Sequence, residues 1–121
     1  MLFRSPWSAE RVAQAQAEGQ PVFVDFTAAW CVTCQFNKRS ALADARVREG
    51  FAERKVLLLR ADWTRRDPLI SAELARLQRS GVPVYALYAP GNPPQLPGPQ
   101  LLSEILTADE VVTALSALSK T

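Results

Sequence analysis

Apolar residues gather in three short runs along this chain, and longer amphipathic stretches separate them. The runs cover residues 21–26, 55–62 and 82–88 and are rich in valine, leucine and aromatic side chains. Runs of this length and composition predict strands that a central sheet buries on both faces. A fourth short strand is predicted at 101–106, "LLSEIL".

Capping signals predict helices between these strands. Ser8 is a suitable N-cap for a first helix, and Gly19 is a suitable left-handed residue to end it. Asp67 is followed by a proline, which favours a helix start, and Thr107 opens a Thr-Ala-Asp-Glu capping box for the last helix. The predicted helices cover 8–18, 31–43, 44–51, 67–80 and 107–118.

The order of these elements predicts the fold class. Helices and strands follow one another as α-β-α-α-β-α-β-β-α, which indicates one small α/β domain with a central mixed sheet flanked by helices. A length of 121 residues with 48% hydrophobic residues fits a single domain over 1–121. The proline-rich segment 89–100 is predicted to be a turn-rich loop, because it is too short to separate two domains.

Composition and charge exclude several classes of function. The net charge is +2 and no run of five like charges occurs, so nucleic-acid binding is not supported. The absence of histidine excludes Ser-His-Asp and Cys-His hydrolases and any zinc site that needs imidazole. The apolar runs are too short to span a bilayer, and the N-terminus lacks the apolar region of a secretory signal. We therefore expect a soluble unit, alone or as part of a larger membrane protein.

Cys31 and Cys34 are the two cysteines of the chain and its candidate reactive centre. A structural disulfide across so short a loop would stabilise the fold by only about 2 kcal/mol, near the low end for such bonds. A structural zinc site needs four ligands, which two cysteines without histidine do not supply. Two thiolates are enough to hold a cuprous ion, so a copper-binding module stays open as an alternative.

A redox role for the pair has stronger physical support. Cys31 follows a predicted strand and begins a predicted helix, so its sulfur faces unpaired N–H groups and the positive end of the helix dipole. Both favour the thiolate, which is the form that attacks disulfides. Cys34 lies one helical turn later, where it can resolve a mixed disulfide. A Cys-x-x-Cys pair in a strand–helix unit therefore predicts thiol–disulfide exchange.

Three further residues have candidate roles or plain structural ones. Strand alternation places Asp25 among apolar neighbours, where burial would raise the pKa of its carboxyl group and suit it to carry a proton. The alternative is an inert, hydrogen-bonded aspartate on a half-exposed face. Trp30 directly precedes Cys31, where an exposed ring helps a partner to dock, although a place in the core is the alternative. Pro83 by itself indicates only the start of a strand.

The segment "VDFTAAWCVTCQ", followed downstream by "GVP" at 81–83, resembles the thioredoxin superfamily. The closer likeness is to the C-terminal thioredoxin-like domain of the membrane thiol:disulfide interchange protein DsbD and to related suppressor-of-copper-sensitivity proteins. This likeness covers roughly residues 20–118. The stretches "DWT..DP" (62–68) and "EILT" (104–107) are its more discriminating parts, because Trp-Cys-x-x-Cys and Gly-Val-Pro occur throughout the superfamily.

The resemblance implies a thioredoxin-like fold and a role for each matching residue. Cys31 would be the attacking thiol, Cys34 the resolving thiol and Asp25 a buried acid. Pro83 would be a cis-proline, and the backbone beside it, at Val82, would pair with the substrate segment.

Two departures from the family concern the surroundings of the cysteines. Val32 and Thr33 replace the Gly-Pro of ordinary thioredoxins, so the redox potential need not match theirs. Lys38 stands where relatives often carry a second acidic residue, which puts a cooperating pair of carboxylates in doubt. A cation at this position would favour the thiolate instead.

Together these observations predict a thiol–disulfide oxidoreductase of the protein-disulfide reductase type. The resemblance implies a place at the periplasmic face of the bacterial inner membrane, as the C-terminal domain of a larger membrane protein. There it would pass electrons from a transmembrane donor domain to oxidised periplasmic proteins. We expect a monomer that needs no cofactor and no metal. A stand-alone cytosolic thioredoxin, the copper-binding module and a binding module with an inert cysteine pair remain alternatives.

Overall fold

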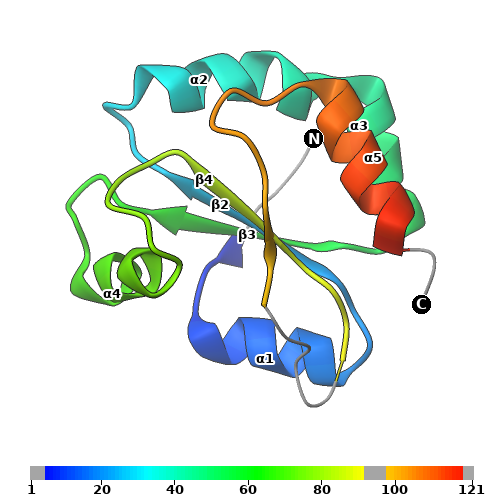
Figure 1. The fold of residues 1–121 in the computed structure, drawn as a ribbon, viewed down its shortest axis with the longest axis horizontal. Coiled ribbons are helices and arrows are strands. Elements are labelled where there is room, and N and C mark those ends of the chain that lie inside the picture. Colours follow the sequence, from blue (N-terminus) through cyan, green and yellow to red (C-terminus); the bar gives the residue numbers. More distant parts are fainter. Residues whose placement is uncertain (1–4, 92–97, 119–121) are drawn as a thin grey trace.

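The computed structural model of this chain describes residues 5–91 and 98–118. Its centre is a five-stranded sheet with the spatial order β1-β3-β2-β4-β5 (Figure 1). β2 pairs with β3 in parallel and with β4 in antiparallel, so the sheet is mixed, as predicted. The strands are β1 (Ser5–Pro6), β2 (Val22–Thr27), β3 (Leu57–Asp62), β4 (Val84–Tyr88) and β5 (Gln100–Leu101).

Helices cover both faces of this sheet. Figure 1 shows α1 and α4 on one side, and α2, α3 and α5 on the other. The longest described helix, α5, has 11 residues, and no helix within 5–91 and 98–118 is long and apolar enough to cross a membrane. The helices are α1 (Ala9–Ala17), α2 (Val32–Arg39), α3 (Ala45–Glu53), α4 (Pro68–Arg76) and α5 (Ala108–Leu118), and a 3₁₀ turn, η1 (Ala41–Ala43), joins α2 to α3.

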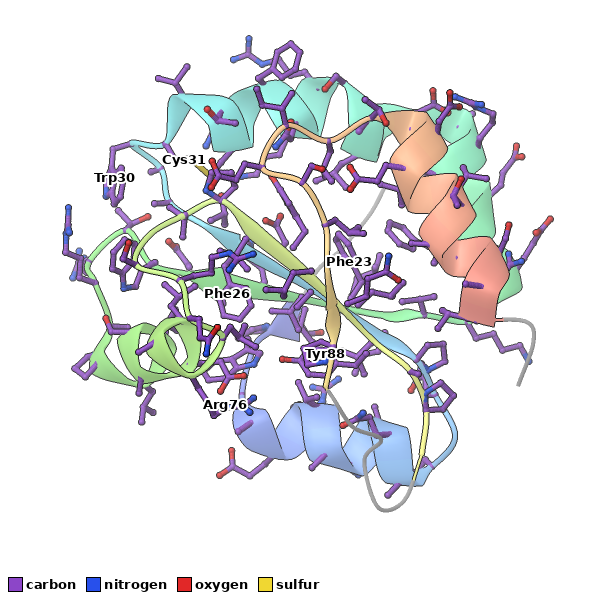
Figure 2. The ribbon with its side chains drawn as sticks, in the orientation of Figure 1. Phe23, Phe26, Trp30, Cys31, Arg76 and Tyr88 are labelled. Atoms are coloured by element: carbon purple, nitrogen blue, oxygen red, sulfur yellow. A yellow bond between two sulfur atoms is a disulfide. The ribbon has the colours of Figure 1, made fainter. Side chains whose placement is uncertain are left out.

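The central strand β2 divides the core into two layers. Val22, Val24 and Phe26 lie in one apolar cluster with side chains of α1 and α4. Phe23 points to the other side, into a cluster with side chains of α3 and α5 (Figure 2). The predicted alternation along this strand is therefore confirmed. All six positions of β2 are buried, so the alternative that placed Asp25 on a half-exposed face is wrong.

Both ends of α1 and the start of α4 follow the predicted capping chemistry. The Ser8 hydroxyl accepts the Arg11 N–H at 3.1 Å, and Gly19 has a φ of 83°, in the left-handed region. Asp67 caps α4 by accepting the Leu69 N–H at 2.8 Å.

The end of α4 differs from the prediction. This helix ends at Arg76, about four residues before the predicted end. Gln78 adopts a φ of 64°, and the Arg79 N–H binds the Leu74 carbonyl at 2.8 Å. These features form a Schellman ending in which glutamine takes the position that glycine usually occupies. Because no glycine marks that position, the sequence pattern did not reveal the end.

The region after β4 contains the second difference. The predicted strand at 101–106 is wrong over most of its length, because β5 covers only Gln100–Leu101. The following backbone turns toward α2, where the Asn37 side chain binds the Glu104 carbonyl at 2.8 Å and the Leu106 N–H at 3.2 Å. Residues 92–97 of the predicted proline-rich loop lie outside the described residues.

The predicted capping box at the start of α5 forms in part. Thr107 accepts the Glu110 N–H at 3.1 Å, as expected. The Glu110 carboxylate instead accepts the N–H and the hydroxyl of Ser103, both at 2.9 Å. The glutamate therefore ties the preceding loop to the helix start.

Candidate functional site

The two cysteines lie where β2 passes into α2, and they form a disulfide. β2 ends at Thr27, and Cys31 is the N-cap residue of α2. The Cα atoms of Cys31 and Cys34 are 5.2 Å apart, and the Cys31 sulfur accepts the Cys34 N–H at 3.1 Å. The predicted strand–helix position of the motif is confirmed, and the Cys31 sulfur faces the N-terminal turn of the helix.

The two sulfur-bearing residues differ in burial. Cys31 is 7% exposed, whereas Cys34 is 1% exposed. They form a small cluster with Ala28, and Val82 packs against it. The Val82–Pro83 peptide bond is cis, as the resemblance implied. Segments far apart in the chain thus meet at the disulfide, and Cys31 is the cysteine that an incoming partner can reach more readily.

Asp25 lies in the middle of β2, on the sheet face that α2, α3 and α5 cover. It is fully buried, with an exposed fraction of 0%. In the sheet register its neighbours are Arg60 on β3 and Tyr85 on β4. The Tyr85 hydroxyl accepts the side-chain amide N–H of Asn37, at 2.8 Å, which places α2 above this part of the sheet. Asp25 is therefore a buried acid beneath the helix that carries both cysteines.

Trp30 is half-exposed, at 50%, immediately before Cys31 (Figure 2). Its indole N–H donates to the Thr64 carbonyl at 3.0 Å. The neighbouring Ala29 N–H donates to the Thr64 hydroxyl at 2.9 Å. That hydroxyl donates to Asp62, which also accepts the Thr64 N–H at 3.0 Å. These bonds tie the loop before Cys31 to the loop after β3, a connection that sequence reasoning missed.

The same loop places an arginine over two aromatic rings. The Trp30 and Trp63 ring centroids are 5.9 Å apart, and the Arg66 Cζ atom lies 5.2 Å from the first and 5.0 Å from the second. Trp63 is buried, and its N–H groups donate to the Thr27 carbonyl at 2.7 Å and the Ser71 hydroxyl at 2.8 Å. The discriminating stretch "DWT..DP" therefore builds a surface next to the disulfide. The stretch was recognisable in the sequence as a motif, but no local sequence pattern indicates which residues it contacts.

Electrostatics in this loop centre on Asp62. The hydrogen bond from the Thr64 hydroxyl is the main cause that lowers the pKa of the Asp62 carboxyl, with smaller contributions from Arg60 and Lys38. Lys38 is half-buried on α2, and its positive charge interacts with the Asp62 carboxylate at the end of β3. The position that departs from the family thus places a cation within electrostatic reach of Asp62, the last residue of β3.

A separate hollow lies away from the disulfide. A cavity of about 810 Å³ opens between α1, α4 and β4, and neither cysteine lines it. Glu73 there forms an ion pair with Arg76 and accepts from the Tyr88 hydroxyl at 3.3 Å. Burial is the main cause that raises the pKa of Tyr88. This cavity is not part of the redox site.

In the part of the chain that the structure describes, metal ligands do not gather around the cysteines. Within residues 5–91 and 98–118, no three cysteine, aspartate or glutamate side chains lie close enough together to hold a metal ion. The two sulfurs are bonded to each other in this state.

Comparison with known proteins fits this geometry. A family model described as thioredoxin-like matches residues 3–90. The chain belongs to the thioredoxin-like family. It is 42% identical over 84 residues to the thiol:disulfide interchange protein DsbD of Ralstonia nicotianae, an alignment that covers 69% of this chain and 14% of the relative. The chain thus spans about one-seventh of that relative's length.

Solved structures support the fold. The oxidised C-terminal domain of DsbD from Neisseria meningitidis matches with a TM-score of 0.70 at 21% identity, covering 95% of this chain and 98% of that domain. A thioredoxin from Thermus thermophilus matches with a TM-score of 0.73 at 21% identity, covering 98% and 88%. The thioredoxin-like fold, the Cys-x-x-Cys disulfide and the similarity to DsbD together support a thiol–disulfide oxidoreductase.

Proposed function

We propose that this domain is a protein-disulfide reductase that passes electrons from a membrane-bound dithiol to oxidised periplasmic proteins. The observation that carries the proposal is the Cys31–Cys34 disulfide at the start of α2, with the more exposed sulfur on Cys31. Cys31 and Cys34 exchange electrons, and Asp25 carries a proton. Trp30, Val82 and Pro83 form the surface that receives the partner.

Cys31 acts as the nucleophile in the reduced protein. The N-terminal end of α2 and the Cys34 N–H stabilise its thiolate, as the 3.1 Å contact in the oxidised state indicates. The thiolate attacks one sulfur of the partner's disulfide, so a Cys31–partner disulfide forms while the partner's own bond breaks. The first partner sulfur leaves as a thiolate and takes up one proton.

Cys34 completes the exchange. Its thiol loses a proton and attacks the Cys31 sulfur, so the Cys31–Cys34 disulfide forms and the second partner sulfur leaves as a thiol. In total two electrons and two protons pass to the partner, and no cofactor takes part. Asp25 is suited to receive the Cys34 proton, because it is fully buried beneath α2, where the neutral form of a carboxyl group is favoured.

The relatives support a proposal about the larger setting. Because the chain covers about one-seventh of the DsbD of Ralstonia nicotianae, we propose that this single thioredoxin-like domain is the C-terminal part of a larger membrane protein. Its electron donor would be a transmembrane domain, and its acceptors would be proteins on the periplasmic side. The domain itself would act as a monomer.

Trapping the mixed disulfide tests this proposal. In Cys34→Ser the resolving thiol is absent, so partners should stay linked to Cys31 after exposure to periplasmic extract. Mass spectrometry after release with a reductant identifies them. The double variant Cys31→Ser/Cys34→Ser is the matched control and should retain nothing by disulfide exchange. Retention that does not depend on Cys31, or retention from cytosolic but not periplasmic extract, would contradict the relay.

A further inference from the structure

We propose that Arg66 and Trp30 form a recognition surface for an acidic side chain beside the partner's cysteine. This inference rests on the proposed disulfide-reductase function and adds the charge of the partner segment to it. The surface comprises Trp30, Trp63 and Arg66, and its Trp30 directly precedes Cys31 in the sequence. We call these three residues the arginine–tryptophan surface.

The guanidinium group of Arg66 is held over the two indole rings. Its Cζ atom lies 5.2 Å from the Trp30 ring centroid and 5.0 Å from the Trp63 ring centroid, within the range of cation–π contacts. The backbone N–H of Arg66 donates to the Trp63 carbonyl at 2.9 Å. The φ angle of Arg66 is 53°, in the left-handed region. A non-glycine residue adopts this conformation at some cost. The turn thus brings the side chain back across both rings.

The nearby carboxylates already have hydrogen-bond donors. Asp62 accepts from the hydroxyl and the N–H of Thr64. Asp67 accepts from the first N–H groups of α4. Among residues 5–91 and 98–118, no ion pair uses Arg66. An exposed guanidinium that contacts two rings and has no ion-pair partner among these residues keeps N–H donors available for a carboxylate.

The surface is preorganised. The Trp30 indole N–H is fixed by the Thr64 carbonyl, and the Trp63 indole N–H by Ser71 on α4. Little side-chain freedom is therefore lost when a partner docks, which favours binding. Because Trp30 is half-exposed and adjoins the nucleophile, a segment that presents its disulfide to Cys31 would pass over this surface. Charge complementarity then favours glutamate or aspartate in that segment.

Three matched peptides test the inference on the reduced protein. Each is a disulfide-linked homodimer of a pentapeptide with a central cysteine, flanked by glutamate, glutamine or lysine. The Cys31 and Cys34 thiols are oxidised to their disulfide, while each peptide dimer is reduced to two thiols. The second-order rate is followed by separating the products after an acid quench. We expect the glutamate peptide to react about two- to fivefold faster than the glutamine peptide, the size of an exposed charge pair.

Variants assign this preference to one residue. Arg66→Gln should lower the ratio of the glutamate rate to the glutamine rate to near one, whereas Arg66→Lys should keep part of it because the charge remains. Arg65→Gln is the matched control, since it removes a neighbouring exposed arginine that has no described ring contact, and it should keep the wild-type ratio. The wild-type ratio should also fall as salt is added.

The outcomes separate this inference from the proposed function. If no peptide oxidises the reduced protein, the reductase proposal itself fails. If all three peptides react at equal rates, the protein is a reductase without this charge preference, and the inference is overturned. A preference that survives in Arg66→Gln, or that disappears in Arg65→Gln, would also overturn it.

Discussion

Thr64 links the loop before Cys31 to the rest of the domain, and its hydroxyl is the group whose removal tests that link. The hydroxyl accepts the Ala29 N–H at 2.9 Å and donates to Asp62 at 2.5 Å. Thr64→Val keeps the size and the branching of the side chain but removes both bonds. The bond from the Trp30 indole to the Thr64 carbonyl remains possible, because it uses the backbone. We expect a folded but less stable protein.

The expected loss of stability follows from these two bonds. A neutral hydrogen bond contributes about 0.5–1.5 kcal/mol, and one to a charged group about 1.5–3 kcal/mol. Both bonds lie at the surface, where water can replace a lost partner, so the upper values do not apply. We therefore expect the free energy of unfolding to fall by about 1–2 kcal/mol, or roughly 4–8 °C in Tm for a domain of this size.

Urea unfolding of the oxidised protein, followed by far-UV circular dichroism, measures this loss. Thr64→Ser keeps the hydroxyl and should recover most of the stability. Thr113→Val is the matched control, because Thr113 is exposed on α5 and makes no described side-chain hydrogen bond. Equal unfolding midpoints for Thr64→Val and Thr113→Val would show that the hydroxyl does not hold the loop, and the reasoning would fail.

Three further changes have defined outcomes. Asp25→Asn should slow the second step of exchange, the attack of Cys34, by about 100-fold or more, since general acid–base catalysis typically contributes that much. The first step should change little. Stopped-flow detection of a longer-lived mixed disulfide checks this, and unchanged kinetics count against it. Asn37→Leu should lower the free energy of unfolding in urea by about 2–4 kcal/mol, because the fully buried side chain no longer hydrogen-bonds the Glu104 carbonyl and the Leu106 N–H. A loss below that of an exposed control contradicts the buried network. The lowered pKa of Asp62 stabilises the folded state above the ordinary carboxyl value of about 3.9, and this contribution is lost as the pH falls through the lowered folded value. The stability difference between wild type and Asp62→Asn should therefore shrink as the pH falls below the ordinary carboxyl value, and a difference independent of pH is the opposite result.

Local sequence signals predicted most of the fold. The three apolar runs became β2, β3 and β4, and Ser8, Asp44 and Asp67 cap the helices that the pattern placed after them. These features are visible in the sequence because they depend on neighbours within a few residues. The two-residue strand β1 was not predicted, since Ser5–Pro6 is too short to carry an alternating pattern.

The same reasoning explains what the sequence could not show at the site. The strand–helix position of the cysteine pair follows from local pattern, and the structure confirms it. The bonds from Ala29 and Trp30 to Thr64 join positions 34 and 35 residues apart, and no periodicity or capping rule reports such contacts. The role of Asn37 was invisible for the same reason, because its partners lie 48 to 69 residues away in the chain.

The central claim is that Cys31 and Cys34 exchange electrons with a partner's disulfide in the order nucleophile, then resolver. Intact-mass spectrometry of the reduced protein, mixed with a disulfide-linked peptide dimer and quenched in acid at increasing times, tests it directly. The claim predicts a transient adduct of one peptide on Cys31, followed by loss of two hydrogens from the protein and release of two peptide thiols. An adduct on Cys34, or a dithiol that stays unreacted, would contradict it.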